Sequence, residues 1–335
     1  MGAKNIDYQR KVFILFVIAV ILLVLAMTAS ISIGRYPIPP KDIVGILRGK
    51  SVNAMTELVF LNLRLPRTIM VLLAGFGLSI SGSVYQTIFK NPLATPDIIG
   101  VSSGANLGAA IAIAFLVGGS ISIALFAFLG GIGAVFFALA LTRLSNERGI
   151  TNFVLAGIVI GSIAQGFIML LKSFVDPERQ LASIEYWAMG SFAGITLDKL
   201  LSILPFYIIG LLGLILLRWE INILSLSDEE GISLGVRVAK VRVAIILSAT
   251  LVVASIVSVS GLISFIGLIG PHIGRMLTKR NDYRTVALSG MVGAIILLVA
   301  DCFARSLTSS ELPISILTTF IGAPFLAYLM IRIRS

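Results

Sequence analysis

Charged residues are scarce in this sequence. Of its 335 residues, 26 are Lys or Arg and 16 are Asp or Glu, and together these make 13%, whereas about 25% is typical of a soluble domain. This scarcity excludes a water-soluble fold. Eight stretches contain no charged residue at all: 12–34, 68–89, 98–142, 149–171, 200–217, 243–274, 285–300 and 312–331. A helix that crosses the hydrocarbon core needs about 20 apolar residues, so these stretches predict an all-α, polytopic membrane protein with about ten transmembrane helices.

Cysteine and histidine are almost absent. Cys302 is the only cysteine, which excludes a disulfide within the chain, and His272 is the only histidine. Metal sites draw mostly on such side chains, so we expect no metal site and no cofactor bound by this chain. His272 lies near the end of an uncharged stretch, where we expect a structural or interfacial role and not proton transfer.

The first long apolar run is expected to be a retained helix. Val12–Leu25 shows no alternation of polar and apolar residues, which a transmembrane β-barrel would need. Its stretch follows three basic residues but exceeds the ~7–15 apolar residues at the core of a signal peptide.

The sequence also lacks the groups needed for catalysis or ion coupling. Ion-coupled transporters and intramembrane enzymes keep ionisable groups in the middle of the membrane, and the eight stretches contain no Asp, Glu, Lys or Arg. Gly45–Ser51 is similar to a phosphate-binding loop but has three residues between its glycines where four are required. We therefore expect no catalytic residue and no ATP site in this chain.

Two of the uncharged stretches are longer than one span. Residues 98–142 divide at Val117–Ser120, where adjacent glycines predict a turn between two helices. Residues 243–274 divide less clearly at Ser258–Gly261. The choice between one and two spans there is made from the basic residues, because cytoplasmic segments carry excess Lys and Arg. With two spans there, 16 of the 26 basic residues are cytoplasmic, against 11 with one span. We predict ten helices with both termini in the cytoplasm.

The segments between the predicted helices are short. Three lie outside, at about 34–67, 172–199 and 301–312, and the largest cytoplasmic segment covers about 218–242. None reaches the ~50 residues of a separate domain, so residues 1–335 are expected to form a single transmembrane domain. The cytoplasmic segment forms either short amphipathic helices or a solvated charged loop. The net charge of +10 reflects the cytoplasmic bias and not a nucleic-acid surface.

Two blocks of motifs indicate a family. The first joins Arg64–Arg67 (Arg-Leu-Pro-Arg) with Ser81–Gln86 and Asn91–Ala105. The second runs over Gly261–Arg275 and continues through Glu311–Ile314. Over nearly the whole chain and in this order, the motifs closely resemble those of FecCD-type permeases, which belong to ABC importers for iron-siderophores, haem and vitamin B12.

This resemblance implies an assembly in the bacterial cytoplasmic membrane. The permease domain would work as a homodimer or with a close paralogue. Two cytoplasmic ATPase subunits, which use ATP and Mg, would power it, and an extracytoplasmic binding protein would deliver the substrate. Ferric siderophore is the first choice of cargo because it is the commonest in the family, while cobalamin, haem and a small oxyanion remain open. The second functional class considered is a secondary transporter or channel that needs no ATPase, and the third is a membrane enzyme.

The resemblance also implies roles for particular residues. Arginines on the outer face of such permeases meet acidic residues of the binding protein, and by motif position these are Arg64, Arg67 and Arg305. The ATPase-coupling segment corresponds to Leu224–Arg242, with the following residues at its centre: Ser227, Asp228, Glu229, Glu230, Gly231, Leu234 and Gly235. The cytoplasmic gate and pathway are expected at Ile150, Thr151, Asn152 and Gln165, although Asn152 stands where the family often has a basic residue.

Overall fold

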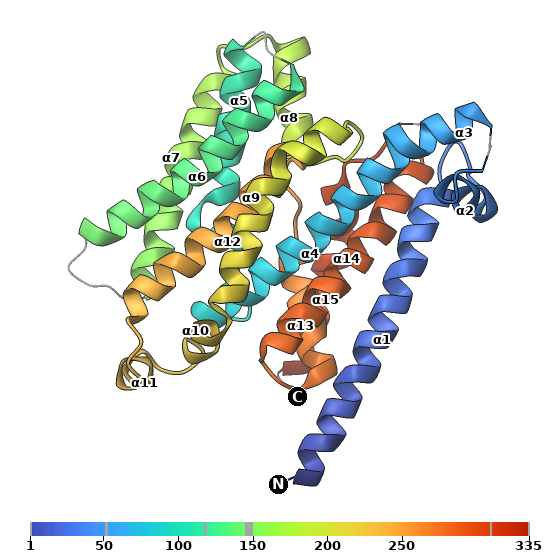
Figure 1. The fold of residues 1–335 in the computed structure, drawn as a ribbon. Helices are drawn as coiled ribbons and strands as arrows, with labels where there is room; N and C mark the ends of the chain where they lie inside the picture. The colour runs from blue at the N-terminus through green and yellow to red at the C-terminus, as the bar shows by residue number, and fades with distance from the viewer. Residues whose placement is uncertain (1, 51–52, 117–118, 145–149, 309, 334–335) are drawn as a thin grey trace. The chain divides into compact units, whose positions relative to one another are not determined.

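The computed structural model describes residues 2–50, 53–116, 119–144, 150–308 and 310–333, and within these ranges the chain is helical and contains no strand (Figure 1). The α-helices are α1 (Gly2–Ser32), α2 (Pro40–Leu47), α3 (Ala54–Val59), α4 (Leu65–Ile88), α5 (Val101–Phe115), α6 (Ser120–Leu144), α7 (Ile150–Lys172), α8 (Ala182–Ala188), α9 (Leu197–Leu216), α10 (Arg218–Ile223), α11 (Asp228–Ser233), α12 (Val238–Ser260), α13 (Ile266–Thr278), α14 (Tyr283–Ser306) and α15 (Ile314–Ile333). Between these α-helices the described residues also form short turns of other helix types. The turns η1 (Phe60–Arg64) and η3 (Pro177–Leu181) are π-helical, and η2 (Pro96–Ile99) is a 3₁₀ turn.

Among the residues that the structure describes, seven helices are long and apolar enough to cross a membrane, judged by length and composition. They are Tyr8–Ser32, Ala54–Ile88, Ser120–Leu144, Ile150–Lys172, Leu197–Leu216, Val238–Ser260 and Tyr283–Ser306. The apolar helices Val101–Phe115 and Ile314–Leu329 are shorter. The all-helical expectation is confirmed, while the count of ten spans and the location of the termini stay predictions.

Several helices extend past the ends of the uncharged stretches. The stretch 285–300 lies within α14, which continues to Ser306 and includes Asp301 and Arg305. Similarly, the stretch 68–89 belongs to a helix that begins at Ala54 and contains Arg64 and Arg67. Arg67 and Arg305 are tolerated inside helices because both pair with Asp301, and Arg64 because its guanidinium donates to backbone carbonyls. The length of an uncharged stretch therefore underestimates the length of the helix that contains it.

Both long stretches are interrupted near the predicted positions. Helix α5 ends at Phe115 and α6 begins at Ser120, although residues 117 and 118 of the predicted turn lie outside the described residues. Helix α12 ends at Ser260, and Gly261 then adopts a φ of 69°. Glycine is favoured there because a side chain is strained at positive φ.

Contacts divide the chain into two compact units, which are described separately. The first contains Met1–Ile80, Phe192–Leu200 and Ser264–Ser335, and the second contains Ser81–Ser191 and Leu201–Ile263. Two of the four boundaries fall inside helices α4 and α9, and the other two fall between elements. The expectation of a single permease domain stays a prediction.

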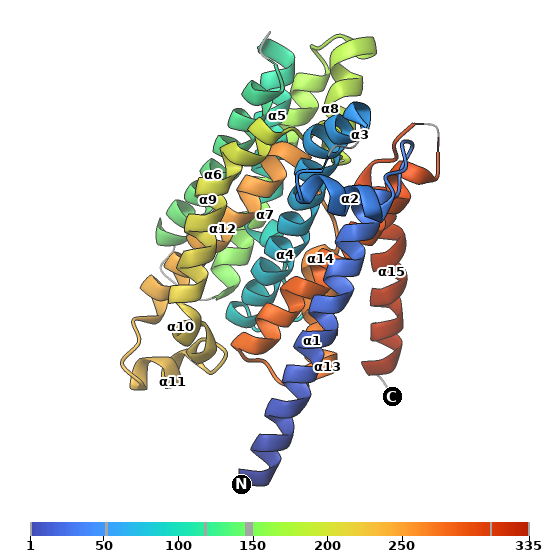
Figure 2. The same cartoon turned by 45° about the vertical axis from the view of Figure 1, so that its right-hand side comes forward.

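In the first unit, α14 is the central helix. It packs against α1, α13 and α15, and α1 runs beside it in both views (Figures 1 and 2). Helix α4 also approaches α14 very closely, since a Cβ atom added to Gly75 would lie 2.5 Å from the Cα atom of Ala294. Small residues permit such close packing of helices in lipid.

The end of α1 is covered by the segment that follows it. Ile31, Ile38, Ile43, Val59 and Phe60 form a buried cluster there. The chain then passes through η1, where the N–H of Leu65 donates to the carbonyl of Phe60, five residues back. The next residue is Pro66, which has no N–H to give to an α-helical bond, so a wider turn is a natural transition into α4. This turn positions Arg64 and Arg67.

In the second unit, α5 is the central helix. It packs against α6, α7 and α12. Glycine permits the closest of these approaches, because a Cβ atom added to Gly108 would lie 2.0 Å from the carbonyl oxygen of Phe126 in α6. The short helices α10 and α11 follow α9 and precede α12 (Figure 1).

Candidate functional site

The three arginines predicted to dock the binding protein lie together in the first unit. Arg64 ends η1, Arg67 is in the first turn of α4, and Arg305 is in the last turn of α14. Their exposed fractions are only 9%, 8% and 4%. The structure therefore brings all three together, although each side chain is largely buried and occupied by contacts within this chain.

Arg67 pairs with two carboxylates. Its Nη2 donates to Oδ1 of Asp301 at 2.8 Å, and its Nε donates to the same oxygen at 3.1 Å. Its Nη1 donates to Oε2 of Glu311 at 2.8 Å. Asp301 is fully buried, so this arrangement satisfies a carboxylate that would otherwise be very unfavourable in the interior.

Arg305 connects this pair to α1. Its Nε lies 3.2 Å from Oδ2 of Asp301, and its Nη2 donates to the carbonyl oxygen of Ser30 at 2.7 Å. The hydroxyls of Ser30 and Thr68 are hydrogen-bonded to each other at 3.0 Å beside it. The buried Nη1 of Arg305 has no hydrogen-bond partner among the described residues.

Arg64 is held by backbone carbonyls at the end of α1. Its Nη1 donates to the oxygen of Ile33 at 2.9 Å, and its Nη2 donates to that of Tyr36 at 3.4 Å. The guanidinium passes directly over Gly34, where an added Cβ atom would lie 2.0 Å from Nη2. Only glycine leaves room for Arg64 in this position.

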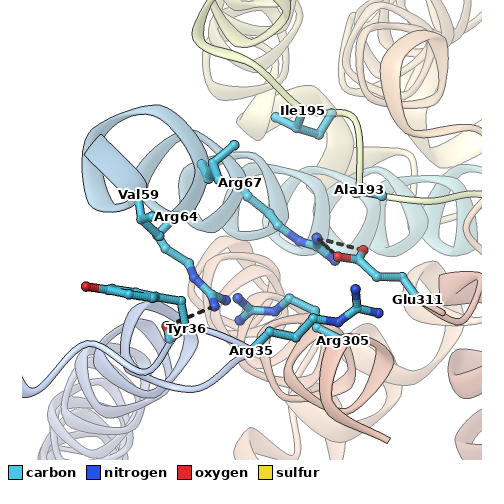
Figure 3. A pocket seen from close by; sticks show the side chains of 10 residues that line it. Arg35, Tyr36, Val59, Arg64, Arg67, Ala193, Ile195, Arg305 and Glu311 are labelled. Atoms are coloured by element: carbon cyan, nitrogen blue, oxygen red, sulfur yellow. Dashed lines mark hydrogen bonds and ion pairs between the residues drawn. The ribbon is translucent and has the colours of Figure 1, made fainter. Parts of the chain in front are cut away.

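These groups surround a cavity of about 220 Å³. Figure 3 shows side chains reaching toward it from different elements. Its polar lining consists of Arg35, Tyr36, Arg64, Arg67, Arg305 and Glu311. Arg35, which is exposed, was not predicted from the sequence, because it precedes the Arg-Leu-Pro-Arg block and belongs to none of the quoted motifs.

The cytoplasmic segment predicted at about 218–242 contains two short helices in the second unit, α10 and α11, and α11 lies within the predicted coupling segment Leu224–Arg242. The Ser227 hydroxyl accepts a hydrogen bond from the N–H of Glu230 at 3.1 Å, and the Glu230 carboxylate accepts one from the N–H of Ser227 at 2.8 Å. This reciprocal capping box fixes the start of α11. At its other end, the N–H groups of Gly235 and Val236 donate to the carbonyls of Ile232 and Gly231, as in a Schellman motif.

Asp228 anchors α11 to the rest of the unit. Its Oδ1 lies 2.9 Å from Nη2 of the buried Arg242 and 3.4 Å from Nζ of Lys90. Burial alone would raise the pKa of Asp228, but the hydrogen bonds and charges of Arg242 and Lys90 outweigh it and leave that pKa below its ordinary value. The carboxylate of Asp228 is therefore paired with basic residues of this chain.

Other side chains of α11 and its C-terminal cap face outward. Glu229 is exposed, as are Ile232 and Leu234 at 64% and 57%. Gly231 is buried, and a Cβ atom added there would lie 3.0 Å from Cγ2 of Val238. The segment thus presents two acidic side chains, Glu229 and the capping Glu230, and two apolar ones, while its other face packs on the unit.

The predicted gate residues lie on α7. Ile150 is its first residue, whereas the preceding residues 145–149 lie outside the described residues. Asn152 is half-buried, Thr151 is exposed, and Gln165 is exposed on a face that is otherwise rich in large apolar side chains. The gate residues are thus separated along α7, with Gln165 about four turns from the first three.

The family model for the FecCD transport family matches residues 21–332. The chain belongs to the FecCD transport family. It is a multi-pass membrane protein and a permease of the ABC transporter class.

Relatives within this family have diverse names. The chain is 38% identical to the molybdate import system permease protein MolB of Haemophilus influenzae, over 94% of each chain. It is 39% identical to a probable iron chelatin transport system permease protein of Helicobacter pylori, over 83% of this chain and 84% of that protein. A solved structure, an inward-facing conformation of a transporter assigned to the metal-chelate ABC type, has a TM-score of 0.86 and 35% identity and covers 95% of this chain and 99% of its own.

Ser227, Glu230 and Gly235 were named as coupling residues, but their role as helix caps was not recognised, although signals for it exist. The Ser-x-x-Glu spacing of Ser227 and Glu230 is the signature of a capping box, and Gly235 stands where a helix commonly ends. These signals favour short helices over a solvated loop. In contrast, no local pattern predicts that Arg242 pairs with Asp228 or that Arg67 pairs with Asp301, because these partners are distant in sequence.

Proposed function

We propose that this chain is the permease subunit of a binding-protein-dependent ABC importer and moves its cargo inward by alternating access. Within the family assignment, the observation that carries this proposal is α11, a capped helix anchored by Asp228 that presents Glu229, Ile232 and Leu234 outward. Such a surface suits a cleft in an ATPase. ATP hydrolysis, with its Mg, belongs to that partner and not to this chain.

The proposed assembly contains two permease subunits, two cytoplasmic ATPase subunits and an extracytoplasmic binding protein. The second permease is another copy of this chain or a close paralogue. Ten spans with both termini in the cytoplasm of a bacterium agree with the excess of basic residues assigned to that side. Gln165 and the start of α7 at Ile150, Thr151 and Asn152 are proposed to border the pathway.

Docking of the binding protein is proposed at Arg64, Arg67 and Arg305. Arginine forks suit carboxylates, and charge of opposite sign speeds encounter. Because Arg64 and Arg305 also have partners within the chain, the double variant Arg64→Glu, Arg305→Glu must first be shown to fold. A folded double variant that binds its binding protein with unchanged affinity in calorimetry would remove this role.

The proposed cargo is a ferric siderophore, with cobalamin and haem as alternatives. Relatives named for iron chelatin and hemin transport support a metal chelate. A second candidate is a small oxyanion, which the arginine-lined cavity and the relative named for molybdate import favour. A secondary transporter without an ATPase remains the competing class.

One reconstitution tests these proposals together. The permease, its ATPase and its binding protein are placed in liposomes, and each candidate cargo is tested for stimulated ATP hydrolysis and for uptake. We expect uptake only with all three proteins and ATP. Uptake by the permease alone, driven by a proton gradient, would contradict the importer and favour the secondary transporter.

A further inference from the structure

We infer that the arginine-lined cavity of the first unit is a binding site for a small tetrahedral dianion. This inference goes beyond the proposed docking of a protein partner. It deepens the proposal of an oxyanion cargo, and because binding is measured on this chain alone, it can hold or fail separately from transport. It rests on the charge, hydrogen-bonding groups and size of the cavity.

The charge of the cavity is positive. Arg35, Arg64, Arg67 and Arg305 line it, and the carboxylates beside them are Glu311 on its wall and Asp301 behind Arg67 and Arg305. These groups carry four positive and two negative formal charges, which leaves +2. A dianion would neutralise this excess positive charge. Its electrostatic attraction to the arginines would be stronger there than in water because the site is partly buried.

The donors of the cavity are held in place before any anion arrives. Arg64 is fixed by the carbonyls of Ile33 and Tyr36, and Arg67 is fixed by Asp301 and Glu311. Arg305 is 96% buried, and its Nη1 has no partner among the described residues. The Arg305 guanidinium is likewise held by Asp301 and by the carbonyl of Ser30, so the arginines need little rearrangement to bind an anion.

The size of the cavity selects a small ion. Its volume of about 220 Å³ lies below the ~300–1,000 Å³ of pockets that hold drug-sized ligands, so a siderophore chelate does not fit within it. The same volume is far above the ~10–15 Å³ needed for a single water. An oxyanion such as molybdate, tungstate, sulfate or hydrogen phosphate, with part of its hydration, matches both limits.

The test is calorimetric titration of the full-length chain in phosphatidylcholine nanodiscs at low salt. The probes are sodium molybdate, tungstate, sulfate and hydrogen phosphate, with nitrate as the monovalent comparison. We expect one dianion per chain, weaker binding of nitrate, and a Kd that rises with ionic strength. A preference for molybdate and tungstate would identify the ligand as an oxyanion cargo, whereas equal binding of sulfate and phosphate would identify it as an anion of the medium.

Two substitutions should change the affinity in opposite directions. Arg35→Gln removes a cavity charge from an exposed side chain and should weaken dianion binding roughly tenfold. Glu311→Gln removes the one carboxylate that lines the cavity among the described residues and should tighten binding severalfold. Arg48→Gln, on an exposed arginine at the end of α2 outside the cavity, is the matched control and should leave the Kd unchanged.

The outcomes are decisive for folded protein, which gel filtration and circular dichroism establish for each variant. Absence of heat from any dianion at millimolar concentration would overturn the inference. So would equal affinity for nitrate and sulfate, or a loss of affinity in Arg48→Gln as large as in Arg35→Gln. Should Glu311→Gln fail to fold, Arg305→Lys is the alternative. It keeps the positive charge but lacks the planar guanidinium with its several N–H donors, so this variant should bind the dianion more weakly than wild type.

Discussion

Arg67 is the most heavily paired side chain among the arginines of the first unit. It lies between Asp301, which is fully buried, and Glu311, which is partly exposed. The pairing stabilises each partner mainly by preventing an isolated charge in a medium of low polarity. Removing one member should therefore destabilise the unit more than the pair itself stabilises it.

We predict that Asp301→Asn lowers the free energy of unfolding by about 3–5 kcal/mol, because Arg67 and Arg305 then lose a buried counter-charge. Thermal or denaturant unfolding in detergent measures the change. The control is Glu185→Gln, which breaks the exposed Lys172–Glu185 pair and should change stability by less than about 1 kcal/mol. Equal effects of the two substitutions would contradict this account.

Gly34 should be required because of Arg64. In Gly34→Ala the new methyl group would overlap the Arg64 guanidinium, and the bonds to Ile33 and Tyr36 would be lost. We predict that Gly34→Ala destabilises the wild-type chain clearly but has a much smaller effect in an Arg64→Ala background. A double-mutant cycle of unfolding free energies measures this coupling. Additive effects would show that backbone strain, and not Arg64, makes glycine necessary.

At the scale of elements, α11 depends on its caps because a helix of six residues has little stability of its own. We predict that Ser227→Ala weakens the start of α11 by about 1 kcal/mol and lowers uptake per ATP hydrolysed in the reconstituted importer. Hydrogen exchange of the α11 amides should accelerate in the same variant. Glu229→Lys makes the matched comparison, since it changes the exposed surface but no cap, and it should uncouple transport without faster exchange.

The anchor of α11 should depend on pH in one direction. The pKa of Asp228 is lower in the folded chain than in the unfolded chain, where it is about 3.9. Its stabilising contribution is therefore complete above pH ~4 and is lost as the pH falls through the lowered pKa. Fluorescence of Trp219 on neighbouring α10, in a Trp187→Phe background, should change only in that acidic range. Asp228→Asn should abolish the transition, and a transition near pH 6 would contradict the assignment.

At the scale of the whole molecule, the predicted orientation can be tested with single cysteines. In a Cys302→Ser background, Arg48→Cys lies in the segment predicted outside, and Arg237→Cys lies in the coupling segment predicted inside. Both arginines are exposed. An impermeant maleimide should label Arg48→Cys in intact cells and Arg237→Cys only after permeabilisation. Labelling of both from one side would contradict an odd number of spans between them.

The sequence predicted the helical class, the family, and the interruptions near Val117–Ser120 and Ser258–Gly261, because hydropathy and glycine act locally. It did not predict where α14 ends, since Asp301 and Arg305 look like the limit of a helix until their partners are known. The pairing of Arg67 with Asp301 joins residues 234 positions apart, and only tertiary structure brings them together. Thus Arg64, Arg67 and Arg305 were named from the sequence, but neither their burial nor the position of Arg35 beside them was predicted.

The number of residues in the π-helical turn η1 fixes how the residues at its two ends are oriented relative to each other. Val59 and Phe60 at its start belong to the buried cluster at the end of α1, while Arg64 at its end reaches the cavity. Deleting one residue such as Leu61 would rotate the two sides relative to each other by about 100° around the helix axis. Either the cluster or the arginine would then face the wrong way. A single deletion here should thus be tolerated far less well than almost any exchange of side chains, and relatives that keep both features should keep the spacing between them.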